Sequence, residues 1–434
     1  MLKPPDPPMT PRSGRIVDRQ NDEELIRAAL ERLRDRRKDK AGVVQFDLVD
    51  DTKGKSVPVA AGQLLLRSTE LDADARKVLD SLGSTVEPVA GLDGVHLVTL
   101  PPTVPGQLKK TYDELRGKGL KVSFNAVVPM GAAPAPDVVW KSLCTPEPVA
   151  SPVVTRPSPV PPAQVRVAVL DTGITDEERA DGWLRGLAHP DGSNVDPLDE
   201  FPVPNDWLDL GAGHGTFVAG IIQRLAPAAD LEVRRVLDSD GLTEETKVAA
   251  AMVAAARAGA QLINLSLGTV TVDDEEPVTL AAALETIRTI EEQEQREIVV
   301  VAAAGNCGTD APVYPGAFDG VVSVAALTTM LQPAPWSSRG AWVKCSAVGE
   351  SVVSTYVPGR EDPFLRPGDI EPVDLPDEYG PSSWALWSGT SFAAPQVTAR
   401  IAQLAAENGI GVRAAADRLL SGGQTYPGYG VSLT

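Results

Sequence analysis

Three short polar sequences could together supply the groups needed for nucleophilic catalysis. Asp171 opens an Asp-Thr-Gly sequence directly after an apolar run, and His214 stands between two glycines. Ser391 follows Gly-Thr at the start of a helical stretch. An acid, a base and a hydroxyl in the order Asp, His, Ser match one of the known orders of a serine-type catalytic triad. We therefore predict that Ser391 attacks a carbonyl carbon, that His214 moves the proton and that Asp171 orients His214.

Each of these sequences also has an ordinary structural explanation. An Asp after a strand is often a turn residue, and a Ser or a His before a helix can simply cap it. The chain holds two other histidines, His96 in an alternating strand pattern and His189 before a proline. Neither has the glycine-bounded setting of His214, so the predicted proton transfer is assigned to His214.

The elements around these residues alternate between strands and helices. Apolar, β-rich runs are found at residues 165–170, 231–236, 261–265, 298–303 and 321–325. Helical stretches are found at residues 215–225, 244–258, 278–294 and from 391 to about 407. This alternation is typical of an α/β fold with a parallel sheet that is covered by helices on both faces. Ligands of such sheets bind at the carboxyl ends of the strands, so we expect the site there.

Four motifs in this region resemble those of the catalytic domain of subtilisin-like serine peptidases, the subtilases. The resemblance runs from about residue 166 to 420 and includes the sequences around Asp171, His214 and Ser391. Asn306, which follows Ala-Ala-Gly, resembles the oxyanion-hole asparagine of the family. The resemblance implies that its amide and the Ser391 N–H stabilise the oxyanion of a tetrahedral intermediate. A plain turn residue is the alternative role for Asn306.

The resemblance also implies two backbone strips that hold a substrate peptide as an added strand, together with a pocket for one side chain. One strip is Ser266, Leu267 and Gly268, the opposing strip is Gly241, Leu242 and Thr243, and the pocket is lined by Ala304, Gly305 and the loop at 309–314.

Residues 43–130 form a separate unit in the order β-α-β-β-α-β, which is the ferredoxin-like arrangement of a small α+β domain. Its place before the catalytic region resembles the propeptides of subtilases, which act as folding chaperones and inhibitors. The resemblance implies that the N-terminal domain is an intramolecular partner of the catalytic domain. It also implies self-cleavage within residues 129–165, where no residue marks the bond. A permanent accessory domain is the alternative.

Two further segments complete the predicted organisation. Residues 1–42 are Pro-rich and then charged, with a helix predicted at 22–40, and they carry a net charge of +3 against −22 for the remainder. Residues 131–165 contain nine prolines and predict a linker, because proline lacks a backbone donor and favours extended chain. The catalytic domain then occupies residues 166–434.

Composition excludes several classes of partner. With 40 Lys and Arg against 59 Asp and Glu, the net charge of −19 argues against nucleic acid or an anionic membrane as a partner. No apolar run is long enough to span a bilayer, and the start lacks the apolar core of a signal peptide. Three cysteines are too few for a disulfide scaffold, so we expect reduced Cys307 and Cys345 and a cytoplasmic protein; a mis-assigned start or a disulfide would instead indicate export.

No cofactor is expected, and no metal site is predicted because the Asn-rich calcium loop of many subtilases is missing after His214. A Pro-rich and acidic insertion at 359–383 is expected to cover one rim of the cleft. We predict a serine endopeptidase that acts on proteins or peptides and is held latent by its N-terminal domain. Two alternatives are a catalytically silent peptide-binding protein and an aspartic peptidase, although the latter needs two Asp-Thr-Gly sequences at a dyad.

Overall fold

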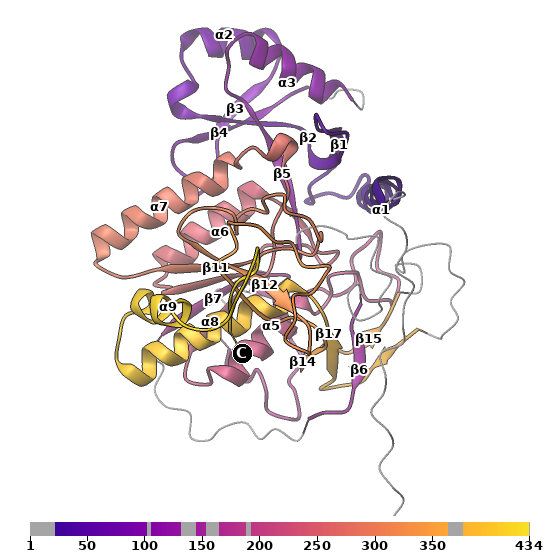
Figure 1. Cartoon of the computed structure of the whole chain (residues 1–434). Coiled ribbons are helices and arrows are strands. Elements are labelled where there is room, and N and C mark those ends of the chain that lie inside the picture. The colour runs from indigo at the N-terminus through magenta and orange to yellow at the C-terminus, as the bar shows by residue number, and fades with distance from the viewer. Residues whose placement is uncertain are drawn as a thin grey trace, which may run out of the picture.

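The computed structural model describes residues 22–101, 106–131, 145–152, 165–187, 192–362 and 376–433. A small N-terminal unit with two helices sits on a larger body that contains the main sheet (Figure 1). His189, Cys144, the first 21 residues and most of the predicted linker lie outside the described residues, as does the central part of the 359–383 insertion.

The body is built on an eight-stranded sheet, and the predicted parallel α/β architecture is confirmed. Every neighbouring pair in this sheet is parallel except the terminal β18–β19 pair. In spatial order, the strands are β18 (Thr425–Tyr426), β19 (Gly430–Ser432), β13 (Cys345–Val348), β12 (Val321–Leu327), β11 (Val299–Ala303), β10 (Leu262–Leu265), β7 (Arg166–Asp171) and β8 (Asp230–Arg235).

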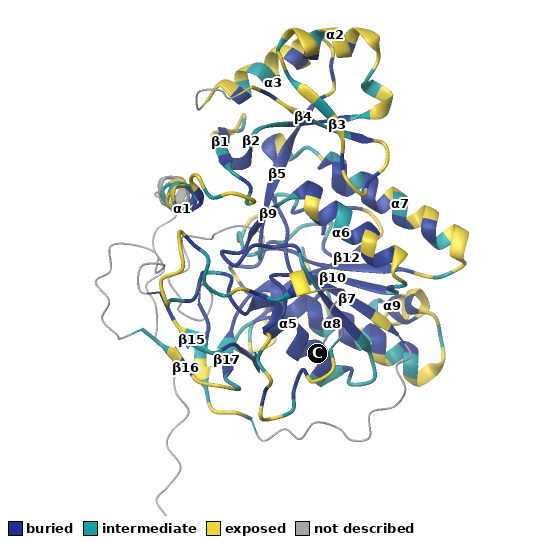
Figure 2. Ribbon diagram, turned by 180° about the vertical axis from the view of Figure 1, so that it is seen from behind, coloured by how far each residue is buried: buried dark blue, intermediate teal, exposed yellow. Residues whose placement is uncertain are grey.

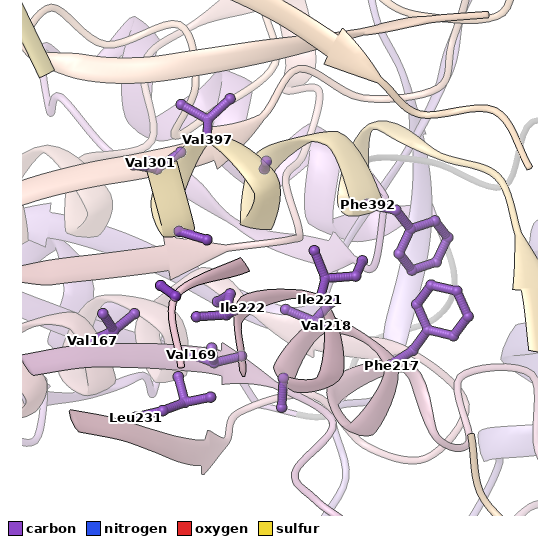
Figure 3. Close-up of a cluster of buried hydrophobic side chains, with 14 of the residues drawn as sticks. Val167, Val169, Phe217, Val218, Ile221, Ile222, Leu231, Val301, Phe392 and Val397 are labelled. Carbon is purple, nitrogen blue, oxygen red and sulfur yellow. The ribbon is translucent and has the colours of Figure 1, made fainter. Parts of the chain in front are cut away.

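Helices cover both faces of this sheet, because successive side chains of each strand point to opposite sides. On β7, Val167 and Val169 belong to one core, whereas Ala168 and Leu170 belong to the other. The first core contains side chains of α5 (His214–Leu225), α8 (Thr390–Asn408) and α9 (Val412–Leu420). The second contains side chains of α6 (Glu245–Arg257) and α7 (Val278–Glu294). Figure 3 shows the first core, in which α5 and α8 pack against the strands.

Two small sheets flank the body. Strand β6 (Glu147–Val149) pairs with β17 (Trp384–Trp387), which also pairs with β14 (Val352–Thr355). The predicted linker therefore contains a strand that belongs to the body's structure. The described ends of the 359–383 insertion form the pair β15 (Gly359–Arg360) and β16 (Glu378–Tyr379).

The N-terminal unit has the predicted order of elements. It consists of β2 (Ser56–Arg67), α2 (Ala73–Ser81), β3 (Thr85–Pro88), β4 (Val95–Thr99), α3 (Gln107–Gly117) and β5 (Ser123–Pro129). Two elements precede them, the predicted helix, α1 (Asp22–Arg37), and a strand that was not predicted, β1 (Phe46–Asp50), which pairs with β2. The sheet order is β3-β4-β2-β5, and β5 then pairs with β9 (Leu242–Glu244) of the body. One sheet thus joins the two units.

Burial follows this layering. Figure 2 shows the central strands of the body's main sheet as buried and much of α2 and α3 as exposed. Three single-turn helices, η2 (Ser68–Glu70), η3 (Gly192–Asn194) and η4 (Val272–Asp274), complete the secondary structure in the described ranges. Among the described helices, none has the length and apolar character needed to cross a membrane.

Removing side-chain volume from the first core should destabilise the body. Ile222 on α5 is fully buried, so Ile222→Ala is expected to lower the free energy of unfolding by about 2–5 kcal/mol, because the cavity cannot fully collapse. Chemical denaturation in a Ser391→Ala background, which prevents self-digestion, measures the change. The control Val203→Ala, at a side chain that is 63% exposed, should have little effect. Equal effects of the two changes would contradict this packing.

Candidate active site

The acid and the base predicted from the sequence are in direct contact. Asp171 ends β7 and His214 begins α5, and both side chains are buried. His214 Nδ1 lies 2.7 Å from Asp171 Oδ1, which also accepts a hydrogen bond from the Thr172 N–H at 2.8 Å. A Cβ atom at Gly215 would stand 2.1 Å from the Gly173 carbonyl oxygen, so the two motifs approach closely because both glycines lack side chains. Asp171 can therefore orient the imidazole of His214.

A second buried carboxyl group, which the sequence did not reveal, links the same two motifs. Asp196 Oδ2 accepts hydrogen bonds from Thr172 Oγ1 at 2.8 Å and from the Gly213 N–H at 2.9 Å. Burial raises the pKa of Asp196 to about 6, because the ionised carboxyl group is removed from water. Asp196 lies just after a short helical turn in a loop with no catalytic motif, so no local signal identified it.

The predicted nucleophile lies in the first turn of α8, where N–H groups have no i−4 partner within the helix and point toward the site. Ser391 Oγ donates to the Ser266 carbonyl oxygen at 3.0 Å, and Ser266 Oγ in turn donates to the Ser391 carbonyl oxygen at 2.7 Å. None of the hydrogen bonds of the described residues joins Ser391 to His214. The His214 ring packs edge-on against Trp387 and beside Phe392, at centroid distances of 5.4 and 5.2 Å. The serine hydroxyl is thus turned toward the Ser266 strip.

The amide of Asn306 is held in a fixed orientation. Its Oδ1 accepts from the Thr390 N–H at 2.9 Å and from Thr390 Oγ1 at 3.0 Å. With the oxygen held there, the Nδ2 donor faces the cleft, where a Cβ atom at Gly131 would come within 2.7 Å of it. Thr390 also accepts a hydrogen bond from the Gly305 N–H at 3.0 Å. Thr390 is therefore a positioning residue that sequence reasoning did not single out.

The two predicted strips face each other across a strand that belongs to the chain itself. At the end of β5, Val128 pairs with Thr243 and Pro129 pairs with Leu242. The Met130 N–H donates to the Gly241 carbonyl oxygen at 2.8 Å. The strip at 241–243 thus holds one edge of this strand.

The strip at 266–268 holds the other edge. The Gly131 N–H donates to the Ser266 carbonyl oxygen at 3.2 Å, and the Gly268 N–H donates to the Pro129 carbonyl oxygen at 3.2 Å. Met130 also forms an antiparallel bridge with Leu267. Residues 127–131 therefore occupy the place that the strips were predicted to provide for a substrate.

Gly131 brings its carbonyl group to the predicted catalytic residues. Its carbonyl oxygen accepts from the main-chain N–H of Asn306 at 3.1 Å, and a Cβ atom at Gly131 would stand 3.3 Å from Ser391 Oγ. The backbone has a φ of +63° there, which glycine adopts without strain. The sequence did not identify Gly131, because nothing local distinguishes it from the many other glycines.

The remaining predicted site residues are only partly accounted for. Ala304 packs in a cluster with Ala325, Val343 and Tyr429, and Gly305 contacts Thr390 as described above. The contact of Ala304 and Gly305 with a substrate side chain stays a prediction, because the residue that lies beside Ser391 in this structure is Gly131, which has no side chain. Cys307, next to Asn306, and Cys345 form no disulfide with each other. Within the described ranges, no group of three or more His, Cys, Asp or Glu side chains is arranged to hold a metal ion.

One buried carboxyl group lies where the N-terminal unit meets the body. Glu245, the first residue of α6, is fully buried, and its carboxyl oxygens form no hydrogen bond of regular geometry. Burial raises the pKa of Glu245 to about 8, and the nearby Thr279 hydroxyl and Ala126 amide offset only part of this effect. Because Ala126 belongs to β5, the N-terminal unit contributes to the surroundings of Glu245.

Comparison with known proteins agrees with this geometry. A family model described as the subtilase family matches residues 163–420, more than half of the chain. A thermophilic serine proteinase of Bacillus sp. (strain AK1) is 31% identical over 281 residues, which cover 61% of this chain and 59% of that protein. Thermitase of Thermoactinomyces vulgaris is 31% identical over 284 residues, which cover 60% of this chain and 84% of thermitase.

A solved structure resembles most of this chain in fold. It is that of fervidolysin from Fervidobacterium pennivorans, described as a keratinolytic enzyme related to subtilisin. The TM-score is 0.57 at 21% identity, with 86% of this chain and 60% of that chain covered. At this identity, the likeness concerns the fold alone.

The buried carboxyl group of Glu245 predicts a pH-dependent stability. The folded protein binds this proton more tightly than the unfolded chain, so its contribution is lost as pH rises from about 5 to about 8. Glu245→Gln cannot ionise, and the stability of wild type relative to this variant should fall by up to about 1.4 kcal/mol per pH unit in that window. Thermal unfolding in a Ser391→Ala background measures this, with exposed Glu292→Gln as the control. A difference that does not change with pH would contradict the prediction.

Proposed function

Because the chain belongs to the subtilase family, we propose that it is a serine endopeptidase, made in a latent form that its N-terminal region holds inactive. The observation that carries this proposal is the position of the Gly131 carbonyl group. Its oxygen accepts a hydrogen bond from the Asn306 main-chain N–H, and a Cβ atom at Gly131 would stand 3.3 Å from Ser391 Oγ. The two strips bind the two edges of the strand that leads to it. A peptide held in this way presents a carbonyl carbon to a serine hydroxyl and its oxygen to hydrogen-bond donors.

The proposed reaction has two steps, acylation of Ser391 and hydrolysis of the acyl-enzyme by water. Ser391 Oγ turns from the Ser266 carbonyl oxygen to His214 and attacks the carbonyl carbon, while His214 takes its proton. Asp171 holds the imidazole and stabilises its charged form. The carbonyl oxygen, which accepts from the Asn306 main-chain N–H in this structure, moves to Asn306 Nδ2 and the Ser391 N–H, and these two groups donate to the oxyanion. His214 then protonates the leaving amine, an acyl-enzyme remains on Ser391, and water, activated by His214, releases the acid.

The same geometry supports self-processing at one bond, between Gly131 and Ala132. The Gly131 N–H donates to the Ser266 carbonyl oxygen, and the Gly131 carbonyl oxygen accepts from the Asn306 main-chain N–H. These contacts support the Gly131 carbonyl group as the one that Ser391 attacks. After this cut, the catalytic part would begin at residue 132 and keep β6, which pairs with β17. The N-terminal part would end at Gly131, with β5 still paired to β9 until it dissociates.

The competing classes are less well supported. An aspartic peptidase requires two facing carboxylates, whereas the partner of Asp171 is His214 at 2.7 Å. A catalytically silent peptide-binding protein would bind peptides without cutting the chain, and the first experiment below separates it from a peptidase.

Mass spectrometry of the intact protein tests the nucleophile. Wild type is expected to separate into a fragment that ends at Gly131 and one that starts at Ala132, whereas Ser391→Ala should stay at 45.7 kDa. Loss of the nucleophile typically lowers such a rate by about 10⁶-fold. Ser388→Ala, at a hydroxyl three residues away, is the matched control and should still be cut. Cutting of Ser391→Ala at the same bond in the absence of other proteases would contradict the assignment.

Gly131→Pro tests the proposed bond. Proline removes the N–H that binds Ser266 and holds φ near −65°, whereas Gly131 has a φ of +63°. The cut after residue 131 should slow by about 100-fold or more, because the carbonyl group is displaced from Ser391. Ala135→Pro, four residues further on and between two prolines, is the control. An unchanged rate of cutting at this bond in Gly131→Pro would show that the processed bond lies elsewhere.

A further inference from the structure

A buried arginine joins the N-terminal helix to the edge of the cleft. Arg37, the last residue of α1, is fully buried and places its guanidinium between two carboxylates of the body. Its Nη1 lies 2.5 and 2.6 Å from the two carboxyl oxygens of Asp240, and its Nη2 lies 2.6 Å from Asp238 Oδ2. The guanidinium also lies 5.1 Å from the centre of the Phe201 ring. We call the site formed by Asp238, Asp240 and Phe201 the anionic niche.

Neighbouring cations reinforce this contact. Arg36 donates to the Phe201 carbonyl oxygen at 2.6 Å and lies 3.3 Å from Asp362 and 3.5 Å from Asp209. Lys40 donates to the Glu200 carbonyl oxygen at 2.7 Å. The charge pattern agrees with these contacts, since residues 1–42 carry +3 and the remainder −22. Arg36 and Lys40 thus contact four groups of the body, although both residues lie before the predicted inhibitory domain at 43–130.

The anionic niche is separate from the catalytic residues but adjoins the strip that holds the strand. Asp240 directly precedes Gly241, whose carbonyl oxygen binds Met130. Above it, Leu33 of α1 packs with Val127 of β5 and Leu242 of the strip. Helix α1 therefore contacts both the strand in the cleft and the strip to which that strand is bound.

The negative charge of Asp238 and Asp240 in the anionic niche is balanced by the Arg37 guanidinium. Asp238 also lies 4.0 Å from Arg235 of the body, whereas Arg37 is the one cation recorded within 4.0 Å of Asp240 among the described residues. A guanidinium matches two carboxylates through its planar fork of N–H groups, which the compact ammonium of lysine does not reproduce. Without Arg37, Asp240 would be left as a buried carboxylate with no opposite charge.

We infer that the anionic niche is an arginine-binding surface of the catalytic domain and that Arg37 of α1 is its occupant, so that α1 is a second inhibitory anchor beside the strand at 127–131. This inference rests on the proposed peptidase function. After the cut at Gly131, the N-terminal fragment would still be held at two places. Each place keeps the other at high effective concentration, so the fragment leaves slowly until one of them is lost.

The full-length chain tests this inference through two separate rates. In Arg37→Ala, the cut after Gly131, followed by intact mass, should keep its rate within about twofold. Hydrolysis of a peptide substrate should then appear at least about 100-fold sooner after the cut than in wild type, because removal of one partner of a buried ion pair weakens a contact by at least about that factor. Arg32→Ala removes an exposed arginine of the same helix and should change neither rate. An equal delay in Arg37→Ala and Arg32→Ala would overturn the inference.

A second measurement does not depend on catalysis. In a Ser391→Ala background, hydrogen exchange should show faster exchange of α1 amides in Arg37→Ala than in Arg32→Ala, with β5 amides unchanged. Arg37→Lys keeps the charge without the fork and should lie between them, and it replaces Arg37→Ala if that variant does not show a cooperative thermal transition. Unchanged α1 exchange would overturn the anchor. If wild type neither cuts itself nor hydrolyses the peptide, the peptidase proposal fails, while the exchange result still decides the anchor.

Discussion

Backbone pairing in the cleft is the interaction on which most of this structure depends. Two strips of the body leave their N–H and C=O groups unpaired unless an extended strand lies between them, and residues 127–131 supply that strand. The pairing sets the register, and the register brings Gly131, rather than a neighbour, to Ser391. It also explains why one sheet runs from the N-terminal unit into the body. The same hydrogen bonds that would position a substrate here position the chain's own backbone.

Buried carboxyl groups mark the places where this arrangement is held together. Asp171 contacts His214, and Asp196 ties the sequences that carry these two residues. Glu245 lies against β5 with no ion pair to any described residue, and Arg37 forms the ion pair of Asp240. Removal of such groups from water is unfavourable unless hydrogen bonds or opposite charges compensate. Two of these four groups lie where the N-terminal region covers the body, so its departure would expose both to water.

The residues before the proposed cut and the residues after it contact the body in different ways, because β6 lies after the cut. Residues before the cut contact the body through a strand, a domain face and a helix, all of which could separate as one piece. Residues after it lead into β6, which lies in a sheet with β17 and β14. The segment that appeared from its prolines to be a linker is thus partly an edge of the catalytic domain. Proline at such an edge is compatible with pairing, because one side of the strand needs no partner.

The amino-acid sequence by itself determined the alternation of strands and helices, and it pointed to Asp171, His214 and Ser391 as site residues, whereas the role of Asn306 was implied by the resemblance to the subtilases. These follow from local patterns: apolar periodicity marks buried elements, and glycines beside a polar residue mark a strand end or a helix start. The tertiary structure alone decided the contacts between distant segments. Thr390 holds Asn306 across 84 residues, and Arg37 reaches Asp240 across 203. Such contacts depend on how the helices and sheets pack in three dimensions, and the residues next to each partner in the chain carry no local signal of that packing.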